Sequence, residues 1–178
     1  MGHKVFLSYH YKMDQWRALL VRSSAVLECN APVTDNEWDR ITRGGDVAIE
    51  RWISAQLAGR HCIVVLIGPT TAGRLWINHE VRQSWNEGMG VVGVYVHNLK
   101  DRIGNQSAKG ANPFDRIAIS GGPDRISSVV KAYDPPYTTS VEVHGYIKNY
   151  LDEWVEEAIA IRHAALNQAR YQPAIRNA

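Results

Sequence analysis

The sequence predicts an α/β fold in which helices cover both faces of a doubly wound, mainly parallel sheet. Its strongest signal is a set of near-continuous apolar runs rich in Val and Ile, at residues 5–9, 62–68 and 91–96. Such runs are typical of strands with both faces buried. Apolar residues at helical spacing occur in residues 13–28, 46–58 and 71–87. Because strands and helices alternate with short connections, we expect a doubly wound sheet.

The remaining strands have weaker signals. One is expected between the first two helices, where residues 31–34 include Pro32. Proline in a strand indicates a sheet edge or an irregular segment. The stretch that follows, residues 35–45, is interpreted as a loop beside an active site or as a short helix. Residues 127–132 are the candidate for a last short strand.

A long amphipathic helix is expected towards the C-terminus. Pro135-Pro136 interrupts the chain, and the Thr-Thr-Ser segment at 138–140 can cap a helix that continues to residue 167. The apolar stripe of this helix would pack on the preceding domain or on a partner. In a homo-oligomer, that partner would be a second copy of the chain. We therefore divide the chain into a domain at 1–137, the helix at 138–167 and a flexible tail at 168–178.

Composition argues against several functional classes. The chain of 178 residues is 45% hydrophobic and 21% charged, as in ordinary globular proteins. Lys and Arg total 20 and Asp and Glu 18, a difference of 2, and no basic cluster indicates nucleic-acid binding. No apolar run approaches the roughly 20 residues that span a bilayer, and the N-terminal apolar segment is too short for a signal peptide. We expect a cytoplasmic protein that binds neither nucleic acid nor membranes.

The two cysteines, Cys29 and Cys62, give no sign of a metal site. They form no C-x-x-C motif, and no histidine lies at a spacing suited to a structural metal. We expect two reduced thiols and no bound metal.

The carboxyl ends of the predicted strands are where a ligand is expected, since doubly wound sheets bind ligands there. One of these ends is followed by Thr70 and Thr71, and either can serve as the N-cap of the next helix. Exposed amide groups in the first turn of that helix favour an anion such as phosphate. We therefore expect Thr70 to lie beside the substrate.

Glu80 is the strongest candidate for a functional carboxylate. Ile77 and every fourth residue after it, up to position 85, are apolar and should face the sheet. Glu80 then lies about 60° from Ile77 around the helix axis, at the border of the apolar stripe. A carboxylate at this border is partly desolvated, which disfavours its charged form. The alternative is a surface residue paired with Arg82 or Arg51, and spacing alone does not decide between the two.

Several motifs resemble those of TIR domains. The Phe-Leu-Ser-Tyr segment at 6–9 resembles their first-strand box, and Trp76 with Glu80 resembles the W-x-x-x-E pattern on the helix after their central strand. The wider pattern resembles the MTH538-type group of TIR-like domains and is similar to the TIR subunit of the Thoeris anti-phage defence system. It also includes IVVLIGPTT at 63–71, RLW at 74–76, EVRQS at 80–84 and NPFD at 112–115. The likeness covers most of residues 4–134.

This resemblance implies a flavodoxin-like fold and an enzyme that takes NAD, or a related nucleotide, as its substrate. It implies cleavage of the nicotinamide–ribose bond and a cyclic ADP-ribose-type product. That product would be a diffusible signal that activates a separate effector, and a phage-derived trigger would start its synthesis. The chemistry needs no metal, because one carboxylate can stabilise an oxocarbenium-like transition state.

The resemblance also assigns roles to individual residues. The catalytic glutamate of the family matches Glu80. The substrate-binding positions that follow from it are Phe6, Ser8, Tyr9 and Trp76, with Asp35 and Trp38 in the loop that closes over the substrate. A dry aromatic pocket of Phe6, Tyr9 and Trp76 would favour cyclisation over hydrolysis. The chain departs from the family in its weak second strand and in the length of the loop that carries Gly44-Gly45.

Two other functions are compatible with the same sequence. A nucleoside deoxyribosyltransferase shares the fold and also uses a glutamate at an anomeric carbon, but it would leave NAD untouched. A non-catalytic TIR docking module would use the polar loop at 100–115 and the C-terminal helix, and it would not need Glu80. A phosphorylated receiver domain is excluded, because it requires acidic residues where this chain has Ser8-Tyr9-His10 and Gly68-Pro69.

Overall fold

The computed structural model describes residues 2–25, 27–119 and 124–171. Within these residues, five parallel strands form one sheet in the order β2-β1-β3-β4-β5. This is the flavodoxin-like strand order, so the predicted fold class is confirmed. The strands are β1 Lys4–Ser8, β2 Glu28–Cys29, β3 Cys62–Ile67, β4 Gly90–Tyr95 and β5 Ala132–Tyr133.

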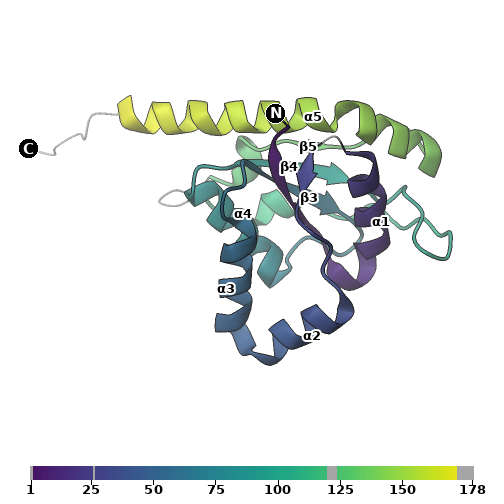
Figure 1. Ribbon diagram of the computed structural model, residues 1–178. Coiled ribbons are helices and arrows are strands. Elements are labelled where there is room, and N and C mark those ends of the chain that lie inside the picture. Colours follow the sequence, from purple (N-terminus) through teal and green to yellow (C-terminus); the bar gives the residue numbers. More distant parts are fainter. Residues whose placement is uncertain (1, 26, 120–123, 172–178) are drawn as a thin grey trace, which may run out of the picture.

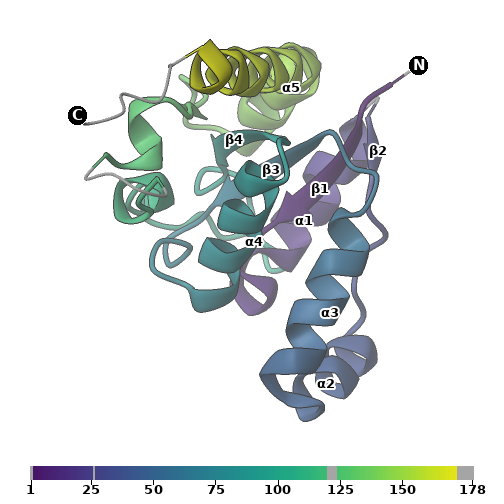
Figure 2. The same cartoon turned by 90° about the vertical axis from the view of Figure 1, so that its left-hand side faces the viewer.

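Helices cover both faces of the sheet. The helices α1 Tyr11–Ser24 and α5 Ser140–Tyr171 pack on one face, and α3 Gly45–Leu57 and α4 Leu75–Asn86 pack on the other. The helix α2 Asp35–Arg43 packs mainly against α3, and the two project from the body of the molecule at the end away from α5 (Figures 1 and 2). The short 3-10 helices η1 Pro113–Arg116 and η2 Ile126–Ser128 lie between β4 and β5 in the chain.

The core is divided by the sheet into two apolar layers. In β1, Val5 and Leu7 pack towards α1 and α5, whereas Phe6 packs towards α3 and α4. Every residue of β3 and β4 is buried, which agrees with the apolar runs that predicted these strands. Successive strand residues point to opposite faces, so Ser8 lies on the same face as Phe6 and looks towards α4.

The predicted second strand is displaced. It was expected at 31–34, but β2 ends at Cys29, and the next backbone contact to β1 is the Asn30 amide on the Val5 carbonyl oxygen at 3.2 Å. Pro32 has no amide hydrogen to continue the ladder. The stretch after it is helical, because Thr34 and Glu37 form a capping box in which each side chain accepts from the other's backbone amide.

The predicted start of α4 is also wrong. Thr70 or Thr71 was expected to be its N-cap, but the helix begins at Leu75 and its N-cap is Arg74. The Thr71 hydroxyl instead accepts a hydrogen bond from the Gly68 amide at 2.8 Å and closes the turn after β3. Gly73, whose φ is +83°, then redirects the chain before the helix starts.

Some residues of the predicted apolar faces are exposed. Trp16 of α1, Val47 of α3 and Leu75 of α4 are 43%, 60% and 67% exposed. In α1 the inward face includes a buried ion pair between Asp14 and Arg17, whose Oδ1 and Nη1 lie 2.7 Å apart. Apolar periodicity could not identify this face because a charged pair occupies part of it.

The last elements also differ from the prediction. The strand expected at 127–132 is β5, which contains only Ala132 and Tyr133. The helix α5 begins where expected, since the Thr139 hydroxyl accepts from the Glu142 amide at 3.3 Å, but it continues to Tyr171. Residues 168–171 of the predicted tail are therefore helical, and 172–178 lie outside the described residues. The domain division at residue 137 stays a prediction.

In the described residues, none of the helices combines the length and the apolar composition that crossing a membrane requires. Both cysteines are free thiols, as expected.

Candidate active site

A pocket of about 410 Å³ opens at the carboxyl end of β1. The chain leaves β1 towards β2 on one side and returns to β3 on the other, so the pocket lies at the switch point where doubly wound sheets bind ligands. Its size falls in the range of small-molecule sites, about 300–1,000 Å³. The lining comes from the end of β1 with the start of α1, the segment before α2, the α2–α3 pair and the first turns of α4.

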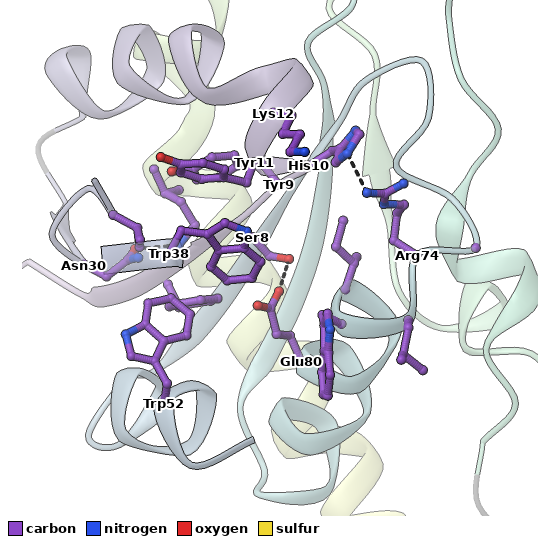
Figure 3. Close-up of a pocket in the computed structure, with 17 residues that line it drawn as sticks. Ser8, Tyr9, His10, Tyr11, Lys12, Asn30, Trp38, Trp52, Arg74 and Glu80 are labelled. Atoms are coloured by element: carbon purple, nitrogen blue, oxygen red, sulfur yellow. Dashed lines mark hydrogen bonds between the residues drawn. The ribbon is translucent and has the colours of Figure 1, made fainter. Parts of the chain in front are cut away.

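Glu80 lies at the inner wall of this pocket, on the face of α4 that meets the sheet. It is only 8% exposed, and the Ser8 hydroxyl donates a hydrogen bond to its Oε2 (Figure 3). Burial raises the pKa of Glu80 from its usual 4.5 to about 7, and the Ser8 hydrogen bond opposes part of this rise. The alternative of a surface glutamate paired with Arg82 or Arg51 is wrong, because the side chain is buried and bonded to Ser8.

The end of β1 supplies the hydrogen-bond partner of Glu80, Ser8, and further residues of the pocket lining. Phe6 and Ser8 are both buried on the α4 face of the strand, and Tyr9 follows in a half-buried position. Burial raises the pKa of Tyr9, so its hydroxyl stays protonated at neutral pH. On the other side of β1, Asn30 accepts a hydrogen bond from the Leu7 amide at 2.8 Å and holds the strand end in place.

An aromatic wall connects α1, α2 and α3. The ring of Tyr11 stacks on that of Trp38 with centroids 5.6 Å apart, and Trp38 meets Trp52 edge to face at 6.1 Å. The Tyr11 hydroxyl donates to Asp35 at the start of α2, and burial together with this bond raises the pKa of Tyr11 to about 12. These contacts hold the N-terminal half of α2 against the pocket and provide flat apolar surfaces for a ring system.

A cationic rim lies on the other side of Glu80 from Trp52 (Figure 3). It contains Lys12 of α1 and Arg74, the N-cap of α4. His10, the N-cap of α1, also belongs to it. The Arg74 Nη2 lies 2.6 Å from the His10 Nε2, and the His10 Nδ1 lies 3.0 Å from the Thr70 hydroxyl. An arginine can only donate, so His10 Nε2 accepts, and Nδ1 carries the proton that points to Thr70.

The pocket brings together most of the residues that the sequence singled out, and two lie outside its lining. The predicted residues that line it are Phe6, Ser8, Tyr9, Trp38, Trp76 and Glu80. Asp35 bonds to the lining residue Tyr11, and Thr70 bonds to the lining residue His10. The phosphate site expected at Thr70 therefore lacks the helix N-terminus on which that expectation depended.

The sequence placed His10 at the ligand-binding end of the first strand but assigned it no role, and it did not predict that Tyr11, Lys12, Asn30, Trp52 and Arg74 line the pocket. A usable signal existed for Tyr11 and Lys12, because they follow a strand whose carboxyl end was expected to face the ligand. Trp52 and Arg74 reach the pocket only through the packing of α3 and the turn before α4. Among the residues described, no cluster of three or more His, Cys, Asp or Glu side chains could hold a metal ion.

Two comparisons with known proteins identify the family of this chain. The family described as "Thoeris protein ThsB, TIR-like domain" matches residues 6–101, which include every residue that lines the pocket. The chain is also 33% identical, over 129 residues, to a Bacillus cereus (strain MSX-D12) protein provisionally named cyclic ADP-D-ribose synthase ThsB1. That similarity covers 70% of this chain and 67% of the relative. The chain therefore belongs to the family of ThsB proteins with a TIR-like domain.

Proposed function

We propose that this protein is an NAD-consuming enzyme of anti-phage defence that cleaves the nicotinamide–ribose bond and makes a cyclic ADP-ribose-type signal. The observation that carries the proposal is the position of Glu80, a buried carboxylate in an aromatic pocket at the switch point of the sheet. The family, and the name of the Bacillus cereus relative, support the same reaction.

The proposed first step needs one carboxylate. The bond between the anomeric carbon and the pyridinium nitrogen breaks, and its electron pair leaves with nicotinamide, which departs neutral without a general acid. Positive charge develops on the ribose, and the Glu80 carboxylate stabilises it in a site of low dielectric. A pKa of about 7 leaves part of Glu80 ionised at neutral pH, and the cationic substrate favours that ionised form.

The second step determines the product. In cyclisation, a nucleophilic atom of the same ADP-ribose bonds to the anomeric carbon and loses its proton, which Glu80 accepts and passes to water. In hydrolysis, water attacks the same carbon instead. The apolar rings of Phe6, Trp38, Trp52 and Trp76 line the pocket and limit the access of water, which favours cyclisation.

The buried carboxylate argues against one of the two rival functions, and the cationic rim argues against the other. A docking module has no use for an acidic group that destabilises the fold by being withdrawn from water. A deoxyribosyltransferase would exchange bases on nucleosides, and its pocket would not need a cationic rim such as that of Lys12 and Arg74. Family membership adds to both arguments.

The cellular role follows from the family as part of the proposal. The cyclic product would diffuse to an effector, and a phage-derived trigger would activate its synthesis in the cytoplasm. The exposed face of α5 and the loop at 100–115 are available for contacts between copies of the chain.

Mass spectrometry of infected cells tests the proposal. Cells that express the wild-type protein should accumulate a cyclic ADP-ribose-type product after infection, and cells that express Glu80→Gln should not. Glu50→Gln is the matched control, because it makes the same chemical change at an exposed glutamate of α3. Equal product from the wild type and Glu80→Gln would remove Glu80 from the mechanism.

A further inference from the structure

The cationic rim of the pocket has no function in the reaction steps above. Within the described part of the chain, Lys12 and Arg74 form no ion pair with any carboxylate. Both side chains are exposed, and both line the pocket. The pocket therefore has two unpaired cations at its mouth and a single carboxylate, Glu80, at its inner wall.

Arg74 does not serve to neutralise Glu80. Burial raises the pKa of Glu80 and the Ser8 hydrogen bond lowers it, and no cation contributes to this balance. The charge of Arg74 instead lowers the pKa of His10, after the larger effect of burial and together with Lys12. Neutral His10 can accept the hydrogen bond from Arg74 Nη2 at 2.6 Å, so the arginine is held while its other donors stay available.

The two sides of the pocket thus suit different parts of one ligand. Trp52 lies on one side of Glu80 and Arg74 on the other (Figure 3). The aromatic side offers flat surfaces to a base, and the cationic side offers the planar donor fork that binds phosphate oxygens. A ribose between these parts would lie beside Glu80.

Resting on the function proposed above, we propose that Arg74 and Lys12 form a subsite for the diphosphate of the dinucleotide substrate, with His10 as the positioning residue that holds Arg74. Charge-assisted hydrogen bonds from arginine to phosphate are about twice as strong as neutral ones. Loss of one such contact is expected to weaken the binding of a diphosphate ligand about ten- to hundredfold.

Isothermal titration calorimetry with two ligands tests the subsite. All variants carry Glu80→Gln, so that NAD is not consumed during the titration. NAD contains the diphosphate, whereas nicotinamide riboside has the same nicotinamide–ribose unit without the diphosphate and the adenosine attached to it. Arg74→Gln should lower the affinity for NAD about ten- to hundredfold and leave the riboside affinity within about twofold. Arg82→Gln is the matched control, since Arg82 is an exposed arginine of α4 outside this pocket, and it should change neither affinity.

The positioning role of His10 has its own readout. His10→Leu removes the acceptor for Arg74 but leaves the guanidinium in place. It should reduce the ratio of NAD affinity to riboside affinity by a smaller factor than Arg74→Gln does. If His10 had a structural role alone, His10→Leu would lower the affinities for NAD and for the riboside by the same factor.

Any of three results would overturn the subsite. Arg74→Gln could have the same affinity for NAD as the Arg82→Gln control, or it could lower the affinities for NAD and for the riboside by the same factor. The third such result is that NAD binds no more tightly than the riboside when Arg74 is intact. The subsite and the proposed function can fail separately. Turnover of NAD by Glu80→Gln alone would remove the function of Glu80, and an NAD analogue whose nicotinamide–ribose bond cannot be cleaved would then replace NAD in the titration and still test Arg74.

Discussion

Replacing Glu80 by Gln is expected to make the folded protein more stable at neutral and alkaline pH, although it removes the proposed catalytic group. In the folded protein, burial raises the pKa of Glu80 from 4.5 to about 7. Because each tenfold change in a proton equilibrium is worth about 1.4 kcal/mol, this rise corresponds to about 3 kcal/mol. Glutamine has almost the same shape, and its amide oxygen can accept the Ser8 hydrogen bond without carrying a charge.

The sign of the effect depends on pH. Below pH 4.5 the carboxyl is protonated in both the folded and the unfolded chain, so ionisation of Glu80 does not change the stability. As the pH rises from 4.5 to about 7, the folded protein keeps a proton that the unfolded chain has lost, and the free energy of unfolding falls. Above pH 7 the full penalty of about 3 kcal/mol applies. The advantage of Glu80→Gln should therefore be absent at pH 4.5 and largest at pH 8.

Urea unfolding measures this difference directly. The six tryptophans report unfolding by fluorescence, and titrations without NAD at several pH values between 4.5 and 8.5 give the free energy of unfolding. NAD is left out because ligand binding would itself stabilise the folded state. Glu50→Gln, an exposed glutamate changed in the same way, should follow the wild type at every pH. A difference between Glu80→Gln and the wild type that does not grow with pH would refute the reasoning.

Further predictions concern the pH profile, the aromatic wall and a close backbone contact. The kcat/KM for NAD should rise with pH as Glu80 ionises near pH 7, and Ser8→Ala should move this rise to higher pH, since the Ser8 hydrogen bond lowers the pKa of Glu80. Trp38→Ala should raise the KM for NAD about five- to hundredfold, because a base stacked on an aromatic ring contributes about 1–3 kcal/mol. Gly110→Ala should lower the free energy of unfolding by about 1–3 kcal/mol, because a Cβ there would lie 2.1 Å from a backbone carbonyl oxygen. In the same urea titration, Gly145→Ala on α5 should not destabilise the protein, because its Cβ would meet nothing within 4 Å.

Each of these predictions has a result that contradicts it. A Ser8→Ala profile that coincides with that of the wild type would show that the bond to Glu80 has no effect on its ionisation. An unchanged KM in Trp38→Ala would remove the aromatic wall from substrate binding. Equal stability of Gly110→Ala and Gly145→Ala would show that the loop around position 110 can move away from the turn after β3.

The strands that could be predicted are those whose burial on both faces gives them a long run of apolar residues. The runs at β1, β3 and β4 are long and apolar because helices cover both faces of these central strands. The edge strands β2 and β5 have two residues each, which is too few for any periodic signal. Their positions depend on pairing with β1 and β4, so local sequence cannot locate them.

The part of the site that could be predicted is the residue whose position follows from helix periodicity. Glu80 was identified because three apolar residues of α4 define the face next to it. Thr70 was placed beside the substrate because the helix was expected to start there, but the turn at Gly73 delays the start to Leu75. His10 and Arg74 come from segments more than 60 residues apart and meet only when α4 is docked beside β1. That contact forms through tertiary structure, and no pattern within either segment predicts it.

A crystal structure of Glu80→Gln with NAD tests the central claim most directly, because the claim is that the residue at position 80 faces the bond that breaks. We expect the nicotinamide ribose to lie against the side chain at position 80, with the anomeric carbon facing it. NAD bound in another cavity, or bound here with its nicotinamide ribose turned away from position 80, would contradict the account.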